Sequence, residues 1–399
     1  MSTTIRVLLL DTGNEWGGGT NSMFELLKRI DRTRFDVTCC FYKDYKKGQG
    51  GRLLSEELAD IGIQLIVLRQ RKQPMWAKLA KELIRGLFAW SKCLKSQWVF
   101  AVEMRWRIKP QAELLQQVLV NGGFDLLYMN NQPASNLEGY LAARTIKIRV
   151  VQHARIDIEL NGFEVDIVNK SVDKIICNSE GLARSYISQG ISNSKVSVVY
   201  NGIDTNLPLP EKHEFVRGEH AFILGTVGSL LSRKCVDHLV LALAKLRNEH
   251  NLKAHLIVVG EGPEKEHLVR LAKNYLVDTH VSWVGFSQNP LKWIQLFDVF
   301  VLASRKEAFG RVLIEAMLCS IPVVSSDVMG PKEVIENQVT GFLYPFGDID
   351  CLALLLATLY SNPPLRHQMG RSGLIRVRKM FSIEAYVAGV VQVLDEVVQ

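Results

Sequence analysis

The sequence predicts an α/β protein made of two doubly wound, Rossmann-like domains. Its 399 residues exceed the usual size of one domain, which is about 100–200 residues. Short runs rich in β-branched residues alternate with helical patterns in both halves of the chain, as expected for βα units that build a parallel sheet. Some of these runs, such as residues 299–302, are continuously apolar. Strands of that kind are usually covered on both faces.

Strands are expected throughout the chain, up to residue 328. The expected ranges are 5–12, 35–42, 63–69, 125–130, 148–154, 174–179, 196–202, 222–228, 254–260, 281–286, 299–304 and 322–328. A polar stretch at residues 204–219 contains two prolines and is the expected linker, which places the domains at residues 1–205 and 206–381. Apolar residues recur at helical spacing after Ser382, so residues 382–399 are predicted to form a terminal helix that packs back on the first domain.

Composition excludes several protein classes. With 22% charged residues, 29 glycines and 12 prolines, the chain is neither collagen-like nor disordered. The seven cysteines form no CxxC pair, so the sequence suggests no zinc site and no disulfide framework, and a reducing compartment is expected. The first apolar run is short and ends in Asp11, so it is interpreted as a strand and not as a signal peptide. No apolar window reaches about 18 residues, so no membrane span is expected.

Positive charge is concentrated in the first half of the chain. The net charge is +7, and residues 69–109 carry eleven basic and two acidic side chains. Such a segment indicates an anionic partner, which could be a nucleic acid, an anionic lipid or a phosphorylated substrate.

One amphipathic helix is predicted within this basic segment, from Trp76 to Trp98. Its expected apolar face consists of Trp76, Leu79, Leu83, Leu87, Trp90, Leu94 and Trp98, and its cationic face of Lys78, Lys81, Arg85 and Lys92. The helix could pack on the first sheet with its charges in water, or it could lie on an anionic membrane, where tryptophans are enriched at the interface.

Candidate site residues follow predicted strands, since ligands of open parallel sheets bind beyond the carboxyl ends of the strands. In the first domain, Gly17, Gly18 and Gly19 follow the first strand, and they could let backbone N–H groups approach an anion. The spacing does not match a GxGxxG or Walker loop. His153 ends a later strand, so we expect its imidazole at the edge of a cleft, where it could donate to a sugar hydroxyl or a phosphate.

The second domain offers cations and carboxylates at the same kind of position. Arg233 and Lys234 follow its first strand and could clamp a diphosphate. Glu307 and Glu315 follow the strand at 299–304. If the residues between them are helical, both carboxylates lie near one face; if Phe309 and Gly310 form a turn, Glu307 lies above the helix start and Glu315 lies inside the helix. Either geometry offers two acceptors to vicinal hydroxyls.

One acidic pair is assigned to structure. Asp348 and Asp350 follow a Pro-Phe-Gly turn and precede an apolar run. Helix capping accounts for them better than metal binding, so no metal site is predicted.

Taken together, these residues resemble the retaining glycosyltransferases of the GT-B fold, in the group called family four or glycosyl transferases group 1. The resemblance covers nearly the whole chain and is strongest from Val199 to Asp348. It rests on a series of segments in the family's order: residues 199–204, 258–263, 299–304, the Glu-x7-Glu motif at 307–315, 315–317, 322–324, 340–343 and 345–348. It implies two Rossmann-like domains that face each other across a cleft.

The resemblance also implies roles for matching positions. Glu307 would contact hydroxyls of the donated sugar, and Glu315 the hydroxyls of the ribose. Lys234 would bind the donor diphosphate, and His153 would lie near the transferred sugar. The remaining donor-binding positions would be Gly17, Gly18, Gly19, Phe309, Gly310, Arg311 and Val312. The family usually has Arg where this chain has Ser229, a contact that Arg233, Arg155 or Arg311 could replace.

The function implied is transfer of a hexosyl unit, with retention, from a UDP- or GDP-linked sugar to an acceptor hydroxyl. No residue matches a covalent nucleophile, so same-face attack is preferred to a glycosyl-enzyme. The sugar nucleotide is a substrate, and no cofactor or metal is expected because cations and helix dipoles neutralise the leaving group. The first domain would bind a saccharide or lipid-linked acceptor, of the lipopolysaccharide kind, and the second domain the donor.

The expected location is the inner face of the cytoplasmic membrane, with an anionic membrane surface as a partner. Two alternatives stay open: a membrane-associated scaffold with a decayed nucleotide-sugar fold, and a nucleotide-sugar 2-epimerase. Nucleic-acid binding would explain the charge but not the site motifs, so no nucleic-acid partner is expected.

Overall fold

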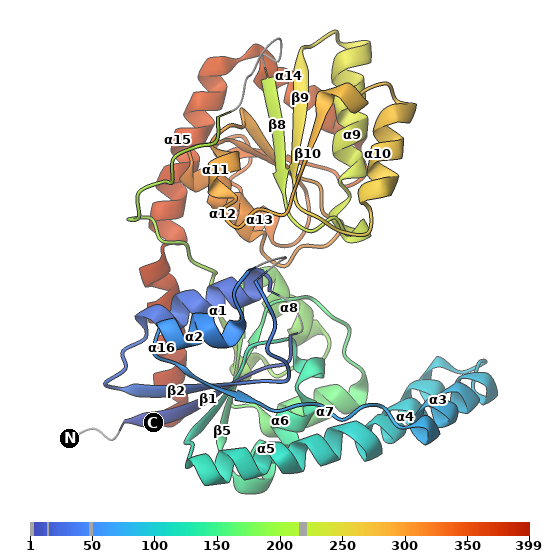
Figure 1. Cartoon of the computed structure of the whole chain (residues 1–399), viewed down its shortest axis with the longest axis vertical. Coiled ribbons are helices and arrows are strands. Elements are labelled where there is room, and N and C mark those ends of the chain that lie inside the picture. The colour runs from blue at the N-terminus through green and yellow to red at the C-terminus, as the bar shows by residue number, and fades with distance from the viewer. Residues whose placement is uncertain (1–3, 14–15, 48–50, 215–221) are drawn as a thin grey trace. The chain divides into compact units, whose positions relative to one another are not determined.

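A computed structural model of the chain contains two parallel-sheet α/β units, as the sequence predicts (Figure 1). The structure describes residues 4–13, 16–47, 51–214 and 222–399, apart from the side chains of residues 92 and 93. The N-terminal unit comprises Met1–Cys177, Ser185–Ser197 and Val390–Gln399, and the C-terminal unit comprises Asn178–Arg184 and Val198–Gly389. The last five residues of the linker predicted at 204–219 lie outside the described residues.

The N-terminal unit is built on a seven-stranded sheet in the order β3-β2-β1-β4-β5-β6-β7. Its strands are β1 Ile5–Asp11, β2 Phe35–Phe41, β3 Gln64–Val67, β4 Leu126–Met129, β5 Arg149–Ala154, β6 Lys174–Cys177 and β7 Val196–Val198. The strand order reverses at β1, where β2 pairs on one side and β4 on the other, both parallel to it. Ligands of doubly wound sheets bind at such a switch point.

The C-terminal unit is built on a six-stranded sheet in the order β10-β9-β8-β11-β12-β13. Its strands are β8 Phe222–Val227, β9 Ala254–Val259, β10 Val281–Gly285, β11 Val299–Leu302, β12 Val323–Ser326 and β13 Gly341–Tyr344. Strand β13 was not predicted. This edge strand has four residues, begins with glycine and leaves Phe342 and Leu343 only half-buried, so its apolar signal is weak.

Helices cover both faces of each sheet (Figure 1). In the N-terminal half they are α1 Gly18–Arg29, α2 Leu54–Asp60, α3 Met75–Leu87, α4 Lys92–Glu103, α5 Lys109–Gly122, α6 Leu137–Ile146, α7 Gly162–Ser171 and α8 Glu180–Ser188. In the C-terminal half they are α9 Asp237–Ala244, α10 Lys265–Asn274, α11 Leu291–Ile294, α12 Arg311–Leu318, α13 Pro331–Val334, α14 Ile349–Ser361, α15 Pro363–Met380 and α16 Ile383–Val398. The predicted terminal helix is therefore confirmed as α16.

The core of the C-terminal unit shows why its strands are apolar throughout. In β9, Leu256 and Val258 belong to a hydrophobic cluster with residues of α9, whereas Ile257 and Val259 belong to a second cluster with residues of α12. Alternate side chains of a strand point to opposite faces. Both faces of this sheet are therefore buried, and the polar residues needed for chemistry are left to the loops at the strand ends.

The basic segment forms two helices and not the single helix predicted from Trp76 to Trp98. Helix α3 ends at Leu87, and Ser91 caps α4 by accepting a hydrogen bond from the N–H of Leu94 at 3.3 Å. A short π-helix, Met104–Ile108, then joins α4 to α5. The apolar spacing continues across the break between the two helices, so periodicity alone did not reveal it. Among the described residues, none of the helices has the length and apolar character to cross a bilayer.

Candidate functional site

The donor-binding residues predicted in the C-terminal unit lie in two loops at the carboxyl ends of its strands and in the first turns of α12. Strands β8 and β11 are parallel neighbours, so the loops after them begin side by side. The N–H of Arg305, after β11, donates to the carbonyl of Arg233, after β8, at 2.8 Å. Neighbouring strands thus bring together residues more than seventy positions apart in the sequence.

Lys234 and Glu307 form an ion pair between these loops. The Lys234 Nζ lies 2.5 Å from the Glu307 Oε2, and the two side chains are 17% and 16% exposed. The Ser304 hydroxyl donates to the same carboxylate oxygen at 3.4 Å. Both charged residues were predicted site residues, but with different parts of the donor as their ligands, so their direct contact was not predicted.

Glu307 lies before α12 and Glu315 lies inside it, which is the second of the two geometries considered. Gly310 separates them with a φ of +87°, in the left-handed region, and α12 begins at the next residue. A side chain at Gly310 would be strained by that φ and would meet Leu313 at 3.0 Å. Phe309 is buried, so its side chain anchors the turn while its backbone remains at the loop.

Glu315 is held by Arg311 one turn earlier in α12. The Arg311 Nε donates to the Glu315 Oε1 at 3.1 Å, and the two side chains are largely buried. Burial raises the pKa of the Glu315 carboxyl, and the guanidinium of Arg311 opposes that shift. Arg311 is thus engaged by Glu315, so it is a weak candidate to replace the arginine that the family usually has at position 229. Val312, the next residue of α12, is half-buried.

Ser229 and Arg233 are both exposed in the loop after β8. Ser229 follows Gly228, which has a φ of +152°. Arg233 lies in a short 3-10 turn, Ser232–Lys234, next to the paired lysine. Of the three arginines considered as substitutes, Arg233 is therefore the one placed beside Lys234.

The predicted glycine loop follows β1 in the N-terminal unit, although residues 14 and 15 lie outside the described residues. Gly17 is the N-cap of α1, and a Cβ added at Gly17 or Gly18 would meet nothing within 4 Å. A Cβ at Gly19 would meet the Arg155 side chain at 3.0 Å. Packing of the described residues therefore gives a reason for glycine only at position 19.

His153 is fully buried at the end of β5, so the expectation of an imidazole that projects at a cleft edge is wrong for its side chain. Its Nδ1 lies 2.5 Å from the Tyr128 hydroxyl and 3.4 Å from the Arg155 guanidinium. Guanidinium groups only donate, so Nδ1 accepts and a neutral ring carries its proton on Nε2. Burial, followed by the charge of Arg155, lowers the pKa of His153 well below its ordinary value.

A buried polar network extends from His153 to the end of β1. Arg155 donates to the Asn130 Oδ1 at 3.0 and 2.9 Å, and the Asn130 Nδ2 donates to Asp11 at 2.8 Å. Asn131 and the N–H of Gly13 also donate to Asp11, at 3.0 and 2.7 Å. Burial raises the pKa of Asp11, and these hydrogen bonds oppose the shift.

Asp11 and Asn130 were not predicted as site residues. Each lies at the carboxyl end of a strand, and the same rule that selected His153 could have found them.

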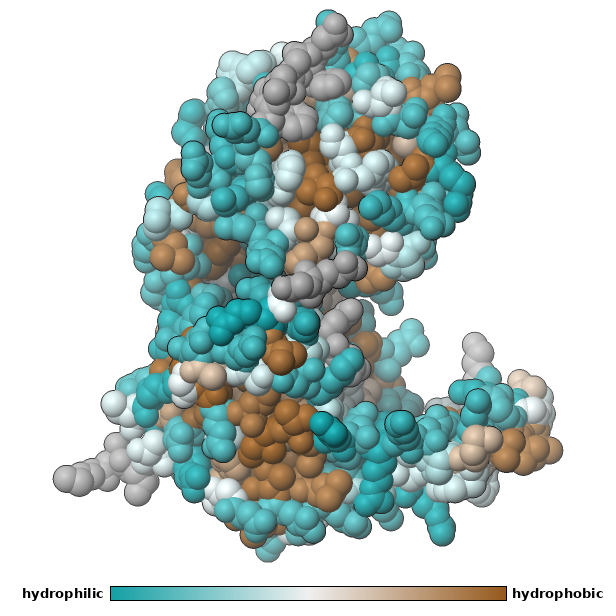
Figure 2. All heavy atoms as spheres, viewed as in Figure 1, coloured by the Kyte–Doolittle hydropathy of each residue, from teal (hydrophilic) through white to brown (hydrophobic). Residues whose placement is uncertain are grey.

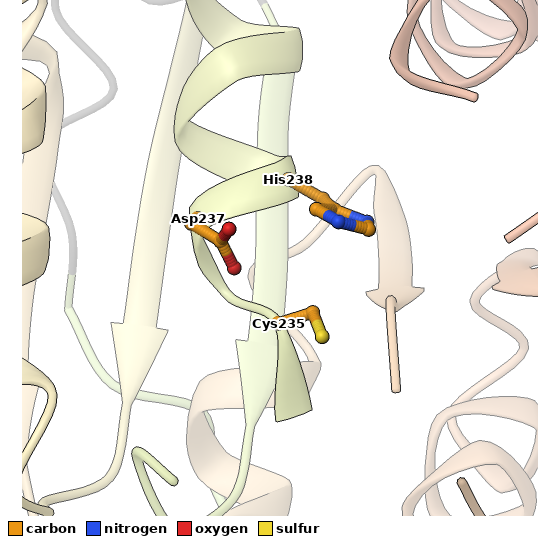
Figure 3. Close-up of side chains that lie close together, drawn as sticks. All are labelled: Cys235, Asp237 and His238. Carbon is orange, nitrogen blue, oxygen red and sulfur yellow. The ribbon is translucent and has the colours of Figure 1, made fainter. Parts of the chain in front are cut away.

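A cysteine, an aspartate and a histidine meet at the start of α9 (Figure 3). Possible ligand atoms of Cys235, Asp237 and His238 lie within 4.8 Å of one another. The charge of Arg305 acts on both Cys235 and His238, and burial raises the pKa of the Cys235 thiol. That thiol donates to the carbonyl of Ser232 at 3.3 Å. A divalent metal ion bound here would have to displace the thiol proton, and the charge of Arg305 would oppose its binding.

The acidic pair after β13 has structural partners. Asp348 caps α14 by accepting from the N–H of Cys351 at 2.8 Å, as predicted. Asp350 forms an ion pair with Lys245 at 2.7 Å.

Comparison with known proteins identifies the class that this fold and these loops define. A family model described as "Glycosyltransferase Family 4" matches residues 16–207, and one described as "Glycosyl transferases group 1" matches residues 210–375. The chain belongs to this family of GT-B glycosyltransferases.

Curated relatives and solved structures agree with this assignment. N-acetyl-alpha-D-glucosaminyl L-malate synthase of Bacillus anthracis is 27% identical over 297 residues, which cover 69% of this chain and 76% of that protein. An N-acetylgalactosaminyltransferase of Campylobacter jejuni, named for a diacetylbacillosaminyl-diphospho-undecaprenol substrate, is 31% identical over 52% of this chain and 56% of its own length. The fold matches Anabaena HepE in complex with UDP-glucose, with a TM-score of 0.77 and 21% identity over 98% of this chain and all of that chain.

Proposed function

We propose that the protein transfers a hexosyl unit, with retention at the anomeric carbon, from a UDP- or GDP-linked sugar to an acceptor hydroxyl. The observation that carries the proposal is the Lys234–Glu307 pair at the edge where β8 and β11 end. A cation there suits a diphosphate, and a carboxylate beside it suits a sugar hydroxyl. The UDP-glucose complex of the structurally similar Anabaena protein supports a nucleotide-sugar donor.

In the proposed reaction, the bond from the anomeric carbon to the diphosphate oxygen breaks, and a bond to the acceptor oxygen forms on the same face of the sugar. The acceptor proton passes to the leaving phosphate oxygen. Lys234 stabilises the charge that develops on the diphosphate, with Arg233 and the N-terminal amides of α12 nearby. We propose that these groups make a metal ion unnecessary. Glu307 orients the transferred sugar, and Glu315 accepts hydrogen bonds from the ribose.

The N-terminal unit is proposed to bind the acceptor. His153, as a neutral ring with its proton on Nε2, would donate to a hydroxyl of the transferred sugar in a donor-bound form that exposes the ring, and the Gly17–Gly19 loop would approach the donor phosphates. A lipid-linked saccharide is the proposed acceptor, supported by the undecaprenol-linked substrate in the name of the Campylobacter relative. The cysteines whose side chains the structure describes are free thiols, as suits a reducing compartment. Together with a lipid-linked acceptor, this leads us to propose that the enzyme works at the inner face of the cytoplasmic membrane.

Thermal shift with a panel of nucleotides and nucleotide sugars tests the donor assignment. At about 100 times Kd, a specific donor should stabilise the protein by about 2.7 kcal/mol. Incubation of the stabilising donor with and without saccharide acceptors then separates the activities. An α-linked product from an α-linked donor supports retaining transfer, an epimerised donor without acceptor indicates an epimerase, and the absence of any donor binding indicates a scaffold.

A further inference from the structure

Helix α3 carries a row of exposed leucines. Leu79, Leu83 and Leu87 are 59%, 66% and 69% exposed, and Trp90, just beyond the helix, is 78% exposed. Residues four apart lie on one side of a helix, so the three leucines form a continuous apolar strip, which we call the leucine row. Figure 2 shows hydrophobic side chains gathered at the end of the projecting α3–α4 hairpin.

The hairpin is held together by a different side of α3. Ala77 is buried, and Lys81 forms an ion pair with Glu103 of α4 at 2.6 Å. Lys81 also lies 5.7 Å from the centre of the Trp106 ring, and Phe88 stacks on Trp98 at 6.3 Å. Lys81 therefore faces inward, which contradicts its predicted place on a cationic outer face.

The leucine row is consequently not the packing face of the hairpin. The alternative in which these leucines cover the first sheet is also wrong, because they remain exposed. Clustered apolar side chains at a surface usually mark an interaction site.

Exposed cations lie elsewhere on the same segment. Arg69, Arg71 and Lys72 precede α3, and Lys78 and Arg85 lie on a third side of the helix, all exposed. The two acidic residues between positions 69 and 109 are engaged: Glu82 pairs with Arg85, and Glu103 pairs with both Lys81 and Arg107. The hairpin surface is therefore positive beside an apolar strip.

We propose that the α3–α4 hairpin is a membrane-docking arm that inserts its leucine row into the boundary between headgroups and acyl chains of an anionic bilayer. Helix α3 has 13 residues and is about 20 Å long at 1.5 Å per residue. The hydrocarbon core is about 30 Å thick, so α3 is too short to cross it. In the proposed arrangement α3 lies in the plane of the membrane surface. Trp76 and Trp90, both exposed, suit the interface, and the net positive charge of the hairpin attracts it to anionic headgroups.

A bilayer fits these features better than a second copy of the chain does. Two hairpins joined through their leucine rows would bring two segments of net positive charge close together, and like charges repel. An anionic surface has the opposite sign and needs no complementary shape. The inference deepens the proposed function and rests on it for its purpose, since docking brings the enzyme to a lipid-linked acceptor; the docking itself depends only on the hairpin.

Vesicle co-sedimentation without donor or acceptor tests the arm separately from the transfer reaction. The full chain should sediment with vesicles that are half phosphatidylglycerol, and weakly with phosphatidylcholine alone. Replacing all three leucines of the row by Ser should lower the partition coefficient at least about tenfold. The matched control replaces Leu276, Leu354 and Ile375 of the C-terminal unit by Ser; these are similarly exposed, at 80%, 62% and 67%, and their loss should leave sedimentation unchanged.

A spectroscopic measurement on the unmodified leucine row guards against misfolding of the triple variant. Lipids brominated on their acyl chains should quench tryptophan fluorescence of the wild type, and Trp90→Phe should remove a large part of that quenching. Failure of the wild type to bind strongly anionic vesicles at low salt overturns the proposal, and so does equal binding by the leucine variant. A dimer that the leucine substitutions dissociate, without vesicle binding, would identify a second copy as the occupant. Soluble-donor binding by thermal shift reports on the proposed function in every case.

Discussion

In the C-terminal unit the candidate donor residues meet as opposite charges, whereas in the N-terminal unit His153 lies in a buried hydrogen-bond network. Lys234 and Glu307 keep some access to solvent, at 17% and 16%. His153, Asn130 and Asp11 are at most 3% exposed, and burial shifts the pKa of His153 downward and that of Asp11 upward.

The difference indicates two ways of preparing a polar site. A partly exposed ion pair is stable without ligand, and its charges can be shared with a diphosphate and a sugar when these arrive. A buried network instead fixes the orientation and tautomer of a neutral group before any ligand binds. Substitutions in the first region should therefore change activity more than stability, and substitutions in the second should change both.

Glu307→Gln should have the largest effect on activity. The amide keeps the volume of the side chain but loses the charge that orients Lys234 and accepts from the sugar. We expect the transfer rate to fall roughly 10²–10³-fold, with a loss of stability of about 1 kcal/mol. Initial rates and chemical denaturation measure the two quantities.

Glu249→Gln is the matched control for this change, because Glu249 pairs with Lys245 on the surface of the same unit. It should leave the rate unchanged. A folded Glu307→Gln protein with near-normal rates would remove Glu307 from the site.

Arg155→Ala should lower both stability and activity, in keeping with a buried network. Asn130 loses a charged donor and His153 loses a neighbour that fixes its tautomer. We expect the free energy of unfolding to fall by about 1–3 kcal/mol. The transfer rate should fall by about tenfold at most. Arg149→Ala, which removes an exposed pair with Asp173, serves as control. Unchanged stability in Arg155→Ala would show that the network does not hold the strand ends together.

Glu315 should give the donor site a pH dependence. Its carboxyl pKa is raised by burial, so the ionised form that accepts from ribose hydroxyls is lost as pH falls through that raised value. Nucleotide affinity should then decrease toward acid pH in the wild type and vary less in Glu315→Gln.

The same shift predicts the opposite trend for stability. A raised carboxyl pKa stabilises the fold below the unfolded value near 4.5, and this contribution is lost as pH rises through the folded pKa. Urea denaturation of both proteins across this range measures it. A steeper decrease of nucleotide affinity toward acid pH in Glu315→Gln would contradict the assignment.

Ser229→Arg should have the smallest effect. An added cation near Lys234 should tighten nucleoside diphosphate binding by about a few-fold, and this gain in affinity should shrink as the salt concentration rises. The rate at saturating donor should not rise, since uniform binding does not accelerate chemistry. Isothermal titration and saturation kinetics separate the two effects. Ser361→Arg adds the same charge at another exposed position of this unit and should leave affinity unchanged. A large gain in the saturated rate would show that Ser229 limits catalysis.

The sequence predicted the two sheets well because their strands are continuously apolar. It did not predict β13, because this strand is short and half-buried and its run of apolar residues is therefore too short to stand out. It also extended several strands past their ends: the strand expected at 299–304 ends at Leu302, and Ser304 beyond it contacts Glu307 instead. Local hydrophobicity does not say where pairing with the next strand stops.

Contacts within the site were less predictable than its members. Lys234 and Glu307 are separated by 73 positions, and only the order of strands in the sheet makes β8 and β11 neighbours. Likewise, the spacing of α3 revealed an apolar side but not that a second side, with Ala77 and Lys81, does the packing. Contacts between residues of different helices and strands depend on how these elements are arranged in the whole fold. That arrangement cannot be deduced from the local pattern of a single sequence.

The helical path from α4 through the π-helix into α5 gives the hairpin a stiff connection to its sheet. Residues 92–122 continue as one rod of about 45 Å, and Gln111 of α5 donates to the carbonyl of Leu68 after β3 at 3.4 Å. An insertion of one residue in that rod would rotate everything beyond it by about 100°. The number of residues in the rod therefore sets the direction in which the hairpin presents the leucine row relative to the sheet.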